Sequence, residues 1–132
     1  QAQAWLDGYK QYEKALFEPQ PRVAEGRLLA RCGGVTAMMD DSDGIALSLY
    51  DLLSVNDCGF SIDSGLVPRP AGIPEPPAPE LAPYVCGAYE LIFTLSPVAG
   101  VPHAVIGKAT PEKTVLVDGQ PMEKRGYQHK WV

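Results

Sequence analysis

The sequence predicts an α+β domain in which a mixed β-sheet packs against helices. Its size is one reason, because 132 residues and 14.2 kDa correspond to a single domain. Its composition is a second reason, since 45% hydrophobic and 20% charged residues are typical of a chain that folds. The spacing of apolar residues is the third. It indicates helix, helix, strand, helix, strand, loop and then further strands.

Three helices are expected in the first half of the chain. Residues 2–17 form an amphipathic pattern that ends before two prolines, which lack the N–H donor that a helix needs. A short helix is expected over residues 23–31, with a glycine pair after it. A third begins after residue 44 and ends near Asn56. The apolar stripes of the first and third helices consist of Trp5, Tyr9, Tyr12 and Leu16, and of Ile45, Leu49, Leu52 and Leu53.

Five strands and one short return strand are expected around these helices. The run Val35 to Met39 is continuously small and apolar, which predicts a buried strand. The other four are expected at residues 59–63, 89–95, 103–109 and 114–117, the last followed by an Asp-Gly turn and a short return strand. Residues 65–83 hold seven of the 13 prolines and are expected to form an irregular loop, with one helical turn near residues 79–82.

Composition excludes several classes of function. The net charge of −5 argues against a general nucleic-acid binder, because phosphate backbones attract clustered Lys and Arg. No apolar run approaches the roughly 20 residues that span a bilayer. The three cysteines are widely spaced with no CxxC pair, so we expect neither a zinc site nor a disulfide framework, and a reducing cytoplasm fits best.

The informative motif is Asp40-Asp41-Ser42-Asp43-Gly44, where an apolar strand gives way to a helix. Three carboxylates so close together repel one another unless a cation is present, and Mg²⁺ prefers such oxygen ligands. Ser42 and the first N–H groups of the helix could meet a phosphate oxygen. This chemistry suits phosphoryl transfer. The alternative is that Asp and Ser only cap the helix, and the spacing leaves both interpretations open.

Four stretches, taken in order, resemble the second half of the thiamine-monophosphate kinases. Residues 19–26 resemble the P-x-P-R segment that opens the C-terminal domain of that family. Residues 35–46 resemble its T-A-M-x-D-x-S-D-G-L-A core, and residues 89–94 its D-Y-E-L-L-F-T strand. Residues 125–129 resemble a G-Y-x-H motif near the C-terminus of the family. Aminoimidazole ribonucleotide synthetase and selenophosphate synthetase belong to the same ATP-using superfamily.

The resemblance implies an enzyme that transfers the γ-phosphoryl group of ATP to thiamine monophosphate with Mg²⁺. Carried over by position, Asp40 and Asp43 would hold the metal and Ser42 would contact the nucleotide. Tyr127 would lie near the thiamine moiety, although a turn residue after a glycine is the plainer interpretation. Asp41 stands where the family usually has an apolar residue, so it is an extra acid. Residues 1–22 would be an N-terminal helix and linker, and residues 23–132 the C-terminal-type domain.

The departures from the family pattern bear on substrate choice and on activity. Acids expected at Gly87 and Ala88 are absent, and one of them helps bind substrate in the family. Glu90 matches its motif, but it could equally be a structural carboxylate. Members of the family also have an N-terminal domain with most of the metal-binding acids and the dimer interface. Catalysis by this chain alone is therefore not expected, because phosphoryl charge must be neutralised from several sides.

Three hypotheses follow from this comparison. The chain is the C-terminal part of a thiamine-monophosphate kinase, active only with an N-terminal domain or second subunit and homodimeric when complete. The same scaffold could instead act on another small phosphoryl acceptor. A third possibility is a non-catalytic nucleotide-binding or assembly module. Neither histidine has a nucleophile partner in the sequence, and His103 is expected to be structural.

Overall fold

The computed structural model describes residues 17–68, 89–96 and 102–127. The predicted helix over residues 2–17, with its aromatic stripe, therefore lies almost entirely outside the described residues, as does the helical turn near residues 79–82. The described elements, in chain order, are α2 (Val23–Arg31), β1 (Val35–Asp40), α3 (Ile45–Val55), β2 (Gly59–Ile62), the 3₁₀ turn η1 (Ser64–Leu66), β3 (Leu91–Leu95), β4 (Gly107–Thr110), β5 (Val115–Val117) and β6 (Gln120–Pro121).

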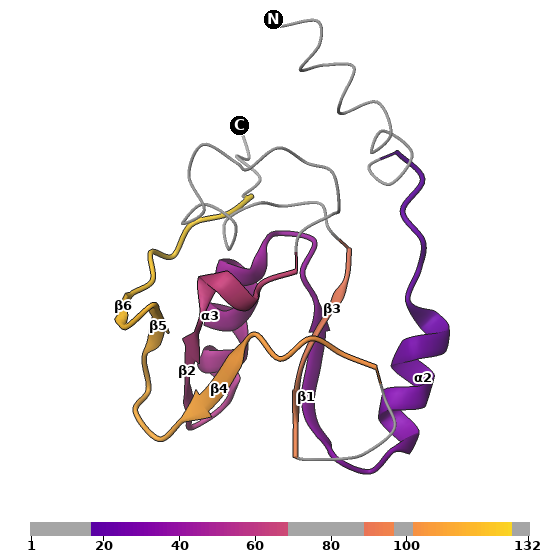
Figure 1. Cartoon of the computed structure of the whole chain (residues 1–132), viewed down its shortest axis with the longest axis horizontal. Helices are drawn as coiled ribbons and strands as arrows, with labels where there is room; N and C mark the ends of the chain where they lie inside the picture. The colour runs from indigo at the N-terminus through magenta and orange to yellow at the C-terminus, as the bar shows by residue number, and fades with distance from the viewer. Residues whose placement is uncertain (1–16, 69–88, 97–101, 128–132) are drawn as a thin grey trace, which may run out of the picture.

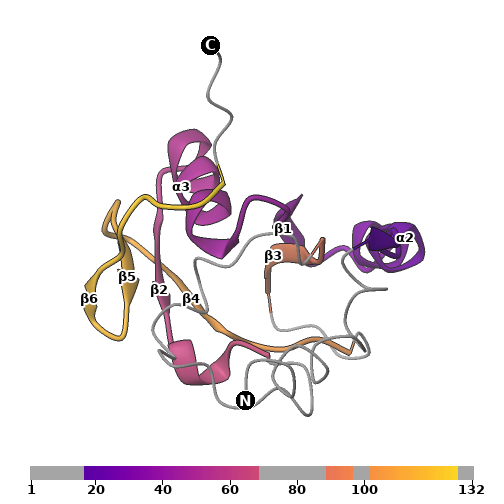
Figure 2. The ribbon, with the colours of Figure 1, turned by 90° about the horizontal axis from the view of Figure 1, so that it is seen from above.

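The strands form two sheets. β1 and β3 pair antiparallel, with Met39 opposite Ile92 and a register shift between Val35 and Ala37. The second sheet has the order β4-β2-β5-β6, in which β2 runs antiparallel to β4 and parallel to β5. Figures 1 and 2 show α2 on one side of the β1–β3 pair, and α3 with the four-stranded sheet on the other. The predicted α+β class with a mixed sheet is confirmed, although the strands divide into two sheets.

The core lies between α3 and the four-stranded sheet. Its buried members come from α3, β2, β5 and the segments that follow η1 and β6: Ala46, Leu49, Leu52, Phe60, Ile62, Val67, Val115 and Met122. The inner face of the β1–β3 pair packs against them through partly buried Ala37, Met39 and Ile92. Burying a Leu, Ile, Phe or Met side chain stabilises the fold by about 1.5–3 kcal/mol, so this cluster ties α3 to both sheets.

The prediction that residues 35–39 form a buried strand is half wrong. The strand exists, but its residues alternate between half-buried and exposed, and Met38 is 37% exposed. Successive side chains of a strand point to opposite faces, and among the described residues the core covers one face of β1. The continuous apolar run could not show this, because both faces of β1 carry apolar residues.

Two other strands are shorter than predicted. β4 begins at Gly107, not at residue 103, because its partner β2 ends at Ile62, which pairs with Gly107. β3 begins at Leu91, since Tyr89 has φ of 53° and lies outside the extended region. The predicted Asp118-Gly119 turn is confirmed, and both residues have positive φ, as tight hairpins require. None of the helices among the described residues is both long and apolar enough to cross a membrane.

Candidate functional site: the acid turn

The acid turn, residues 40–44, joins the end of β1 to the start of α3. The Gly44 N–H donates to the Asp41 carbonyl at 2.8 Å, which closes the turn. Gly44 has φ of 98°, a conformation that side-chain-bearing residues rarely adopt. The turn therefore needs glycine at its last position, and its acids are presented at a fixed junction of strand and helix.

The acids of the turn do not cap α3, so the capping interpretation is wrong. The N-cap residue of α3 is Gly44, and no side chain caps this helix. The first turn of α3 also holds no acid. The turn acids therefore do not cap α3, and they have other contacts.

Asp40 and Ser42 form one unit on the exposed side of the turn. The Ser42 hydroxyl donates to Asp40 Oδ2 at 2.5 Å, and the Ser42 N–H donates to the same oxygen at 3.3 Å. The bond from the Ser42 hydroxyl lowers the pKa of Asp40 below its ordinary value, so this carboxylate is charged at neutral pH. Asp43 is also exposed. The carboxylates of Asp40 and Asp43 therefore both belong to exposed residues of the acid turn.

Asp41, the extra acid of the motif, faces inward. Only 7% of the residue is exposed, and its Oδ1 accepts a hydrogen bond from the Glu90 N–H at 2.8 Å. Burial raises the pKa of Asp41, opposed in part by that hydrogen bond. Among residues 17–68, 89–96 and 102–127, no three His, Cys, Asp or Glu side chains are grouped to hold a metal. The structural reason is that Asp41 is engaged by the backbone before β3.

Glu90 is paired with the chain segment before α2. Its two carboxylate oxygens accept from Arg22 Nε at 2.8 Å and Arg22 Nη2 at 2.6 Å, which makes a bidentate ion pair. These bonds raise the pKa of the already charged Arg22. Of the two interpretations left open for Glu90, this contact favours the structural one. Sequence reasoning noted Arg22 and Glu90 in separate motifs and had no signal that the two residues meet.

Tyr127 reaches the acid turn from the far end of the chain. The Tyr127 N–H donates to the Asp43 carbonyl at 3.2 Å, and half of the residue remains exposed. The residue before it, Gly126, runs so close to the turn that an added Cβ would lie 2.4 Å from the Asp43 oxygen. The structure therefore places the backbone of Tyr127 beside the turn that carries Asp40, Ser42 and Asp43.

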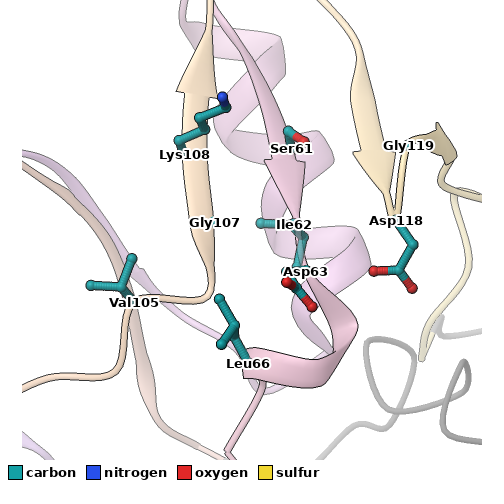
Figure 3. Close-up of a pocket in the computed structure, with 9 residues that line it drawn as sticks. All are labelled: Ser61, Ile62, Asp63, Leu66, Val105, Gly107, Lys108, Asp118 and Gly119. Atoms are coloured by element: carbon teal, nitrogen blue, oxygen red, sulfur yellow. The ribbon is translucent and has the colours of Figure 1, made fainter.

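The other singled-out residues lie elsewhere in the fold or outside the described part of the chain. Gly87, Ala88 and His129 lie outside the described residues. The ring of His103 contacts the ring of Phe93 edge-on, with centroids 6.0 Å apart, as suits a structural histidine. A shallow depression of about 550 Å³ lies away from the turn, between η1, β4 and the Asp118-Gly119 turn (Figure 3). None of its lining residues belongs to the acid turn or to the segment around Tyr127.

Fold and site together define an α+β domain with paired exposed acids between a strand and an uncapped helix. No family model matches the sequence. The chain is 40% identical over 130 residues to the thiamine-monophosphate kinase of Methanospirillum hungatei, an alignment that covers 96% of this chain and 45% of that protein. It is 38% identical over 125 residues to the thiamine-monophosphate kinase of Halobacterium salinarum, covering 86% of this chain and 43% of that protein.

A solved structure shows the same fold. The crystal structure of thiamine monophosphate kinase from Aquifex aeolicus matches with a TM-score of 0.71 and 22% identity, over 83% of this chain and 40% of that one. The chain thus spans less than half the length of these relatives. The resemblance to the C-terminal part of thiamine-monophosphate kinases is confirmed.

Proposed function

We propose that this chain is the C-terminal, substrate-side part of a kinase that transfers the γ-phosphoryl group of ATP to thiamine monophosphate. Its partner in that reaction is an N-terminal domain or second subunit, and the complete enzyme is a homodimer in the cytoplasm. Residues 23–132 form the C-terminal-type domain. The observation that carries the proposal is the contact between the Tyr127 segment and Asp43, because it unites two motifs from opposite ends of the chain.

Asp40 and Asp43 are proposed to hold Mg²⁺. Their chemistry fits, because both are exposed carboxylates and Mg²⁺ is usually bound by one or two carboxylates together with substrate phosphates. The lowered pKa of Asp40 keeps that ligand charged at neutral pH. When bound, Mg²⁺ neutralises phosphate charge and orients the transferred group.

Ser42 and the start of α3 are proposed to receive a phosphate oxygen of the nucleotide. The Ser42 hydroxyl now donates to Asp40, and it would turn to the phosphate when the carboxylate binds metal. Because α3 has no side-chain cap, its first N–H groups add donors and the positive end of the helix dipole. Tyr127 is proposed to stack on the thiamine moiety, since the residue is half exposed, its backbone contacts the turn, and thiazolium is cationic.

A calorimetric titration of Mg-ATP tests the proposal. Asp40→Asn and Asp43→Asn are expected to weaken binding at least tenfold, because each removes a charged metal ligand. Asp51→Asn, an exposed acid on α3 with the same loss of charge, is the matched control and should bind like wild type. Mg-ATP binding that is unchanged in both turn variants would overturn the metal assignment. An acceptor screen with a supplied N-terminal half decides between thiamine monophosphate and other acceptors.

A further inference from the structure

A buried acid in the middle of the acid turn requires an explanation beyond metal binding. Asp40 and Asp43 are exposed, whereas Asp41 is 7% exposed and turned toward β3. Burying a carboxylate is costly unless hydrogen bonds compensate it. The contacts of Asp41 therefore indicate what the fold gains from an acid at this position.

Asp41 holds Glu90 at two points. Its side-chain Oδ1 accepts from the Glu90 N–H at 2.8 Å, and its own N–H donates to the Glu90 carbonyl at 3.1 Å. The carbonyl of Asp41 in turn accepts from the Gly44 N–H, the bond that closes the acid turn. One residue thus uses its side chain, N–H and carbonyl to join the acid turn to the segment that leads into β3.

The segment held by Asp41 needs such support. Tyr89 has φ of 53°, a conformation that is strained for a residue with a side chain. Regular pairing between β1 and β3 begins at Asp40 and Leu91, so Glu90 lies just before the paired region. Its N–H donates instead to the Asp41 carboxylate. On the outer side, the Glu90 carboxylate is held by both bonds from Arg22. Asp41 therefore connects the acid turn to Glu90, and Arg22 holds Glu90 in turn.

We propose that Asp41 is a positioning residue, which sets the orientation of Asp40 and Asp43 by fastening the acid turn to the backbone of Glu90. What matters at this position is the acceptor oxygen, aimed at the Glu90 N–H. The role in ligand binding rests on the proposed function. The positioning role itself is a property of the protein without nucleotide.

Amide hydrogen exchange followed by NMR tests the positioning directly. Glu90 is an exposed residue outside the regular ladder, yet we expect its amide to exchange at least tenfold more slowly than an unstructured amide. Fast exchange of this amide in the wild-type chain would overturn the proposal without any variant. In Asp41→Leu, the Glu90 and Gly44 amides are expected to exchange at least tenfold faster than in wild type. Unchanged rates in this variant would also overturn it.

Rescue by the conservative variant separates positioning from charge. Asp41→Asn keeps an oxygen aimed at the Glu90 N–H, so it should retain slow exchange even if Asp41→Leu does not fold. If these amides exchange as fast in Asp41→Asn as in Asp41→Leu, the role of the acceptor oxygen is overturned. Asp51→Leu, the same substitution on the exposed side of α3, is the matched control and should leave both amides unchanged.

A Mg-ATP titration of the same variants connects positioning to the proposed function. We expect Asp41→Leu to bind at least tenfold more weakly and Asp41→Asn to bind within threefold of wild type. Wild-type affinity in a folded Asp41→Leu variant would overturn the link to the ligand. Absence of Mg-ATP binding even when an N-terminal half is supplied would count against the proposed function, while the exchange rates, measured without nucleotide, still decide the positioning role.

Discussion

Replacing Gly126 by alanine is expected to push the Tyr127 segment away from the acid turn. An added Cβ would lie 2.4 Å from the backbone oxygen of Asp43 and 2.6 Å from Leu47 Cδ1. Real Cβ contacts are essentially never shorter than 3.0 Å, so the segment or the turn must move by about 0.6 Å, the difference between 3.0 and 2.4. The clash involves a backbone atom and a buried residue, which cannot rotate out of the way as an exposed side chain would.

The expected cost of Gly126→Ala is about 1–3 kcal/mol, the usual range for overpacking a well-packed site. Urea denaturation measures it as a lower midpoint with an unchanged slope. Because the Tyr127 N–H bond to the Asp43 carbonyl would lengthen, Mg-ATP affinity should fall in parallel.

Gly26→Ala is the matched control for this substitution. Gly26 lies within α2, and its added Cβ would meet Leu91 Cδ1 at an ordinary contact distance of 3.6 Å. Because alanine favours the helix more than glycine does, the substitution should leave stability unchanged or raise it by about 1 kcal/mol. Of the two Gly→Ala substitutions, only Gly126→Ala is expected to lower the free energy of unfolding. A Gly126→Ala variant as stable as wild type, with the same affinity, would refute the close approach of the Tyr127 segment to the acid turn.

Three further predictions concern stability. Met122→Ala empties a site that is 2% exposed and should cost about 2–5 kcal/mol in the free energy of unfolding, measured by urea denaturation; a cost below about 1 kcal/mol would contradict its place in the core. Arg22→Gln breaks an ion pair at the surface, so it should cost only about 0.2–1 kcal/mol and the cost should shrink in high salt; a salt-independent loss would argue against an electrostatic contact. Because the Ser42 hydroxyl lowers the pKa of Asp40 from 3.8, the pair contributes stability above that pH, and the contribution is lost as the pH falls through the lowered value. The stability difference between wild type and Ser42→Ala should therefore be present at pH 6 and shrink toward pH 3, and a difference that stays constant over this range would contradict the assignment.

Local patterns were sufficient for several of the elements and for noticing the acid turn. The helix over Val23–Arg31 and the Asp118-Gly119 turn match their predicted positions, because a helical period and an Asp-Gly pair between strands act within a few residues. The acid turn was recognised in the same way, from acids that directly follow an apolar run. Asp40, Ser42 and Asp43 need no distant contact to be noticed, since neighbours in the chain present them together.

Contacts between distant segments decided the rest. The outer face of β1 is exposed because, among the described residues, the core covers only its other face, a fact that an apolar run does not encode. The sequence marked Asp41 only as an extra acid without a matched role, and the structure buries it against the backbone of Glu90, far along the chain. Whether an acid binds solvent, a metal or a backbone N–H depends on what the folded chain brings to it. For Asp41 that neighbour arrives only when β3 pairs with β1.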